Sequence, residues 1–123
     1  MSETQQKIME INKSRDVFRK ASPKLTDAFK TLRAEACNDQ GVLDYKTKEL
    51  IAVAVAVARK CEPCILSHLD VALKSGITRE ELVEALNISI LLCGGPGFAY
   101  ASSTLKSYDE LLQADSAHSV VSP

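Results

Sequence analysis

The sequence contains no tryptophan, and aromatic residues make up only 5% of its 123 residues. A hydrophobic core must therefore consist mainly of aliphatic side chains. An excess of charge is also absent, because 15 basic residues face 16 acidic ones. Nucleic-acid grooves and anionic membrane surfaces select basic proteins, so we expect neither nucleic acid nor membrane among the partners.

Long apolar runs are missing as well. The longest, residues 50–58, has about half of the ~20 residues that a membrane-spanning helix needs. The first residues lack the basic region and apolar stretch of a secretory signal. We therefore expect a cytoplasmic protein. In that reducing compartment, two nearby cysteines are more often redox-active or metal-binding than a permanent crosslink.

Strand signals are weak, whereas helical periodicity and helix-capping residues recur along the chain. The pattern predicts helices at about residues 4–20, 23–37, 45–60, 63–75, 79–93 and 98–113. We expect a single all-α domain over residues 1–123, with its core within about 23–112 and a disordered tail at 115–123. About six helices would form the bundle, and its centre would be a helical hairpin that carries a C-x-x-C motif.

The predicted helix at 45–60 is apolar on all sides, so we expect it to be buried on every side. Its alternation of large residues and alanine is also compatible with a strand; length and alanine content favour the helix. A second subunit would help to cover such a helix in a chain of this size. Thr78 and Glu81 form a capping box for the helix that follows.

The C-x-x-C motif consists of Cys61 and Cys64, and His68 follows one helical turn later. At i, i+3 and i+7 these residues share one face of a helix. The two cysteines lie at the predicted helix start, where free amides and the helix dipole favour a thiolate over a thiol. Pro63 suits a first-turn position because it needs no hydrogen-bond acceptor there.

Glu49 is the last charged residue before the apolar centre of the preceding helix. In an antiparallel hairpin that turns near residue 61, Glu49 lies about one turn, roughly 6 Å, from the level of His68. A carboxylate that orients an imidazole beside a thiol is a known arrangement in nucleophilic catalysis. A simpler interpretation also stands, in which Glu49 is a first-turn acid favoured by the helix dipole.

The spacing Glu49-x11-Cys61-x2-Cys64-x3-His68 resembles the signature of the carboxymuconolactone decarboxylase superfamily, in particular its alkylhydroperoxidase D-like branch. The resemblance extends over about residues 23–112. It implies an all-α fold, assembly into homo-oligomers, often trimers or hexamers, and a cofactor-free thiol peroxidase activity of peroxiredoxin type.

By this resemblance, Cys64 would attack a hydroperoxide and become a sulfenic acid, and Cys61 would resolve it to a disulfide. His68, oriented by Glu49, would relay protons. A dithiol or thioredoxin-like reductant would then restore the thiols. The sequence departs from alkylhydroperoxidase D at Pro63, where that protein has a histidine.

Other functions remain open on the sequence. Cys-Glu-Pro-Cys also resembles the dithiol of thioredoxin-type enzymes, which favours disulfide exchange with Cys61 as the attacking thiol. The superfamily also includes decarboxylases that act on a small lactone acid, a chemistry that needs no dithiol. A third alternative is a non-catalytic module in which Cys61, Cys64, His68 and Glu49 bind zinc.

The remaining cysteines, Cys37 and Cys93, have no titrating neighbours at helical spacing, so we expect them to fill the core or an interface. The glycine-rich run at 94–97 lacks a following lysine and a preceding strand, so it indicates a helix break rather than a phosphate loop. We expect no role for His118.

Overall fold

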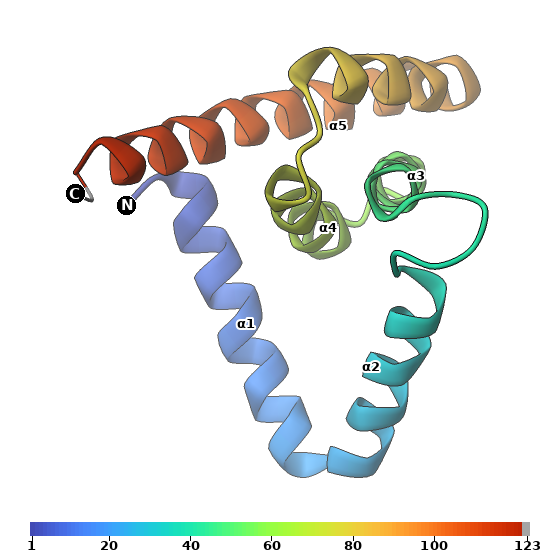
Figure 1. Ribbon diagram of the computed structural model, residues 1–123, viewed down its shortest axis with the longest axis vertical. Helices are drawn as coiled ribbons and strands as arrows, with labels where there is room; N and C mark the ends of the chain where they lie inside the picture. Colours follow the sequence, from blue (N-terminus) through green and yellow to red (C-terminus); the bar gives the residue numbers. More distant parts are fainter. Residues whose placement is uncertain (122–123) are drawn as a thin grey trace.

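The computed structural model describes residues 1–121, and over this range the chain is helical with no strands (Figure 1). The helices are α1 (Glu3–Ala21), α2 (Pro23–Ala36), α3 (Tyr45–Ala58), α4 (Glu62–Lys74) and α5 (Arg79–Val121). The predicted all-α fold is confirmed. These described residues form five helices, whereas about six were expected, because the last two predicted helices form the single element α5.

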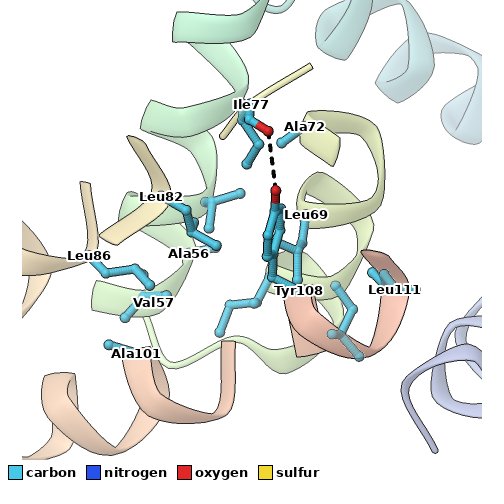
Figure 2. Packing of buried hydrophobic residues seen from close by; sticks show 13 residues of the cluster. Ala56, Val57, Leu69, Ala72, Ile77, Leu82, Leu86, Ala101, Tyr108 and Leu111 are labelled. Atoms are coloured by element: carbon cyan, nitrogen blue, oxygen red, sulfur yellow. Dashed lines mark hydrogen bonds between the residues drawn. The ribbon is translucent and has the colours of Figure 1, made fainter. Parts of the chain in front are cut away.

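The helices α3 and α4 form the predicted central hairpin, and α5 packs against both. Aliphatic side chains dominate the core between them (Figure 2), as the lack of aromatic residues implied. One aromatic residue, Tyr108, is buried there, and its hydroxyl donates a hydrogen bond to the Ile77 carbonyl oxygen at 3.3 Å. This bond gives the buried tyrosine hydroxyl a hydrogen-bond partner within an otherwise apolar environment.

The local capping signals have the predicted geometry. The Asp44 side chain accepts a hydrogen bond from the Thr47 amide at 2.8 Å, which fixes the start of α3. At the start of α5, the Glu81 amide donates to the Thr78 hydroxyl at 3.1 Å, and the Thr78 amide donates to the Glu81 carboxylate at 2.8 Å. Gly76 has φ of +94°, the left-handed conformation that suits the residue after α4.

The expectation that α3 is buried on every side is wrong for the single chain. Val53 and Val57 are fully buried, but Ile51 and Val55 on the opposite side are 48% and 54% exposed. One chain places α4 and α5 against α3 and leaves the remaining face uncovered. This face and α5 line an apolar groove of about 340 Å³.

The first two helices project from the rest of the molecule as a V-shaped pair (Figure 1). Near its N-terminus, α1 is attached to α5, because the buried Thr4 amide donates a hydrogen bond to the Glu110 carboxylate at 3.2 Å. Helix α2 has no buried residue, and its apolar side chains Leu25, Phe29 and Leu32 are each more than 60% exposed.

The glycine-rich run at 94–97 is a kink inside α5, where Gly94 has φ of 64° and ψ of −139°. After the kink, Gly97 lies so close to the earlier half that an added Cβ would come within 3.0 Å of the Ser89 carbonyl oxygen. The second half continues to Val121, through most of the segment that was expected to be a disordered tail. No glycine or proline interrupts residues 98–121, so nothing in the backbone ends the helix earlier. Residues 122–123 and the side chain of His118 lie outside the described part.

By length and composition, residues 79–116 of α5 could cross a membrane. The kink at Gly94 divides this stretch, and Leu82, Leu86 and Ala101 within it belong to the core shared with α3 and α4. Core helices of globular domains, which are mostly buried, pass the same length and composition test, and 22% of the most apolar window of α5 is buried here.

Candidate functional site

The two cysteines of the C-x-x-C motif lie at the start of α4 and are joined by a disulfide, with their Cα atoms 5.3 Å apart. Cys61 is the N-cap of the helix, and its Sγ accepts a hydrogen bond from the Cys64 amide at 3.3 Å. Both cysteines are half-buried. The sulfur atoms therefore lie where helix amides favour negative charge and where a reactant from solvent can reach them.

His68 lies one turn after Cys64 on α4, and its Nδ1 is 2.8 Å from the Glu49 Oε2 on α3. The hairpin thus brings Glu49 to the imidazole, as its register predicted. Glu49 is fully buried, and no hydrogen bond from the side chains and backbone that the structure describes reaches its Oε1. A carboxylate accepts a hydrogen bond from protonated Nδ1, and this tautomer leaves Nε2 available as a proton acceptor.

Cys37 is a site residue that the sequence analysis missed. Its Sγ, an oxygen of Glu49 and a nitrogen of His68 all lie within 4.8 Å of one another. Burial raises the pKa of the Cys37 thiol, and the negative charge of Glu49 raises it further. Cys37 has no titrating neighbour at helical spacing, as the sequence indicated, but the fold brings Glu49 and His68 to it from other helices.

Tyr45 lies near the same carboxylate. Burial, followed by the charge of Glu49, raises the pKa of the Tyr45 hydroxyl. Both shifts favour the neutral forms of the Cys37 thiol and the Tyr45 hydroxyl.

Two arginines complete the surroundings of His68, and neither was singled out in the sequence. Arg33 of α2 has its Nη2 3.3 Å from the His68 Nδ1, and its Nη1 donates to the Ser67 hydroxyl at 3.0 Å. Arg15 of α1 donates to the same hydroxyl at 3.1 Å. Helices α2 and α3 thus contribute side chains that contact the His68 imidazole, and α1 reaches the neighbouring Ser67.

The alternative zinc set of Cys61, Cys64, His68 and Glu49 would require a reduced protein, because in this structure the two sulfurs form a disulfide and are not thiolate ligands. Among residues 1–116, the donors that cluster are those of Cys37, Glu49 and His68. These three could hold a metal only with Cys37 deprotonated, which its raised pKa opposes. The guanidinium of Arg33 adds a positive charge that would repel a cation.

A shallow groove of about 260 Å³ runs between α1 and the start of α4. Pro63, which stands between the two cysteines, forms part of its wall together with Ile11 and Ser14 of α1. Pro63 stands between the two cysteines, so the residue beside the disulfide is apolar and cannot transfer protons.

Comparison with known proteins gives one family. Residues 23–107 match the model of the carboxymuconolactone decarboxylase family. An uncharacterised protein of Cupriavidus necator is 42% identical over 105 residues, which cover 85% of this chain and 92% of that protein. Alkyl hydroperoxide reductase AhpD of Mycobacteroides abscessus is 36% identical over 63 residues, or 51% of this chain and 35% of that protein.

Solved structures give the same result. A carboxymuconolactone decarboxylase family protein of Legionella pneumophila is 39% identical with a TM-score of 0.85, covering 89% of this chain and 97% of that one. A family protein of Thermotoga maritima, described with a suggested role in the antioxidative response, is 25% identical with a TM-score of 0.80. That match covers 91% of this chain and 95% of the other.

Proposed function

Because the chain belongs to the carboxymuconolactone decarboxylase family, we propose that it is a thiol-dependent peroxidase of the alkylhydroperoxidase D-like kind. One observation carries this proposal: a half-exposed disulfide caps a helix one turn from an imidazole that a buried carboxylate holds. The similarity to AhpD and to a structure with a suggested antioxidative role supports it.

In the proposed reaction, the Cys64 thiolate attacks the outer oxygen of a hydroperoxide and the O–O bond breaks. The leaving alkoxide takes a proton from His68 and departs as an alcohol, and Cys64 becomes a sulfenic acid. The Cys61 thiolate then attacks the Cys64 sulfur, and hydroxide leaves as water after protonation. An external dithiol supplies two electrons and two protons to reopen the disulfide, so one hydroperoxide and one dithiol give alcohol, water and a disulfide.

His68 suits the proton relay because Glu49 accepts the hydrogen bond from Nδ1 and leaves Nε2 to exchange protons. Glu49 acts as a positioning residue, since it contacts the imidazole of His68 and not the reacting sulfur atoms of Cys61 and Cys64. In contact with the imidazole at 2.8 Å, the Glu49 carboxylate would stabilise an imidazolium formed during the relay.

Disulfide exchange is the second candidate function. It is favoured by the Cys64 amide, which donates to the Cys61 sulfur and would stabilise a Cys61 thiolate in the reduced protein. Cys61 would then attack a substrate disulfide. The decarboxylation of a lactone acid, from which the family takes its name, would make no use of the two cysteines.

We also place the enzyme in the cytoplasm as a homo-oligomer, a trimer or hexamer. A reducing compartment suits a disulfide that must reopen in each cycle. The apolar groove between α3 and α5 and the exposed apolar side of α2 are surfaces that a second copy would cover, since both are rich in aliphatic or aromatic side chains. Sedimentation measures the subunit number directly.

The test is a steady-state assay of hydroperoxide consumption with a dithiol donor. Wild-type protein should turn over, and Cys64→Ser should lose at least 100-fold in rate because the attacking sulfur is gone. Cys93→Ser is the matched control, since Cys93 lies on α5 away from the site, and it should keep the wild-type rate.

Mass spectrometry of a single turnover separates the two candidate functions. With the peroxidase mechanism, Cys61→Ser still consumes one equivalent of peroxide and leaves Cys64 as a sulfenic acid. If Cys61→Ser is inert and Cys64→Ser still forms a mixed disulfide with substrate, the order of the cysteines in the proposed peroxidase is refuted.

A further inference from the structure

Two positively charged side chains converge beside His68. The guanidinium groups of Arg15 and Arg33 both donate hydrogen bonds to the Ser67 hydroxyl oxygen, at 3.1 and 3.0 Å. Among the side chains that the structure describes, neither arginine forms an ion pair with a carboxylate. By contrast, Arg19 and Arg79 each pair with an aspartate.

Both guanidiniums retain unused donors. Because the proton on the His68 Nδ1 is directed to Glu49, this nitrogen has no lone pair for the nearby Arg33 Nη2. A guanidinium carries five N–H donors, and Arg15 uses one of them within the described residues. Donors of this kind bind the two oxygens of a carboxylate in a planar, two-point arrangement.

The charges are not balanced. Glu49 is connected to this cluster through His68, and it offsets one of the two positive charges. Burial lowers the pKa of Arg15, and repulsion by Arg33 lowers it further. Two cations that approach each other and share one hydroxyl are unfavourable unless an anion binds between them.

We propose that Arg15 and Arg33 bind the carboxylate of an anionic hydroperoxide substrate and so make the enzyme selective for hydroperoxides that carry an acid group. This inference rests on the proposed peroxidase function. Ser67 lies one turn after Cys64 on α4, and side chains three apart on a helix have Cβ atoms about 5–6 Å apart. A carboxylate at the arginine pair therefore lies within a short carbon chain of the reactive sulfur.

The selectivity has a plain physical origin. A carboxylate gains charge-assisted hydrogen bonds at this position, whereas an ester of the same size gains none. The reaction at sulfur is unchanged: the O–O bond of the acid-bearing hydroperoxide breaks, its outer oxygen becomes water and its inner oxygen becomes the alcohol, with the dithiol supplying both electrons.

The experiment compares 4-hydroperoxy-4-methylpentanoate with its methyl ester, because the two differ in charge far from the peroxide group. We expect wild-type kcat/KM to favour the acid by about tenfold or more, the size expected for a hydrogen bond to a charged group. Arg15→Gln should remove most of this preference, because it should raise KM for the acid far more than KM for the ester. Arg19→Gln, on the same helix but paired with Asp16, should change neither rate.

A binding measurement separates this inference from the proposed function. Calorimetry at low salt with 4,4-dimethylpentanoate, which lacks a peroxide group, should show binding to wild type and Arg19→Gln and at least tenfold weaker binding to Arg15→Gln. If no hydroperoxide is turned over but this anion still binds through Arg15, the peroxidase fails and the anion site stands.

Equal kcat/KM for acid and ester, unchanged in Arg15→Gln, would overturn the inference and leave the peroxidase intact. The same conclusion follows if Arg15→Gln changes the subunit number in sedimentation without weakening anion binding, because the arginines would then pair with acidic side chains of another copy.

Discussion

The contact between Glu49 and His68 allows a quantitative prediction. Glu49→Gln keeps the size of the side chain and an oxygen that can accept the Nδ1 hydrogen bond, but it removes the negative charge. A hydrogen bond to a charged partner contributes about 1.5–3 kcal/mol, and one between neutral groups about 0.5–1.5 kcal/mol. At 2.8 Å and with the carboxylate fully buried, the charge itself is worth about 1–1.5 kcal/mol.

That free energy corresponds to a rate decrease of about tenfold if the charge stabilises the imidazolium that forms during proton transfer. The measurement is stopped-flow oxidation of the reduced protein by hydrogen peroxide, with disulfide formation as the readout. Glu84→Gln is the matched control, since Glu84 is exposed on α5 and should not affect the rate. Urea unfolding of the same samples verifies that both variants are folded.

A Glu49→Gln protein that reacts within twofold of wild type would refute the reasoning, because a charge that stabilises the transition state cannot be removed without cost. Glu49→Ala extends the test. It removes the acceptor as well as the charge, so it should react more slowly than Glu49→Gln and lose the tautomer preference that NMR of the imidazole nitrogens reports.

Three further outcomes are expected. Because burial and Glu49 raise the pKa of Cys37, alkylation of this thiol by iodoacetamide should begin at a higher pH than for an ordinary thiol. Glu49→Gln should move the onset of alkylation to lower pH. Mass spectrometry of the Cys37 peptide measures the onset, and an unchanged onset in Glu49→Gln would contradict the contact between Cys37 and Glu49. Reducing the disulfide should lower the free energy of unfolding by at most about 2 kcal/mol, since it closes a loop of only four residues; a larger loss in urea titrations would mark it as a structural crosslink. Leu82→Ala, at a fully buried core position, should cost about 2–5 kcal/mol in the same titration, and a cost below 1 kcal/mol would argue against the packing of α5 on α3.

The features that follow local rules could be predicted from the sequence. Helix caps such as Asp44 and the Thr78–Glu81 box depend on residues three apart in the sequence. Their hydrogen bonds can therefore be predicted without knowledge of the rest of the chain. The contact of Glu49 with His68 was also accessible, because an antiparallel hairpin of two regular helices has a fixed register.

What escaped prediction depends on the path of the chain between helices. Cys37 reaches Glu49 through the connection from α2 to α3, and Arg15 reaches Ser67 because α1 crosses α4. No periodic pattern encodes either approach. The exposed face of α3 could not be predicted for a similar reason. Its apolar side chains show that the surface needs a partner, but they do not show whether the same chain provides that partner.

Helix α4 has two sides with different tasks. One face carries Cys64 and His68, and Ile65 and Leu69, each one residue later and about 100° round the helix, lie in the core. In the proposed peroxidase, the reactive sulfur would therefore sit on a helix that also contributes to the hydrophobic core. Removing a single methylene from this part of the core should then displace the sulfur atoms, so the rate of the proposed reaction should depend on interior packing as well as on the residues at the sulfur.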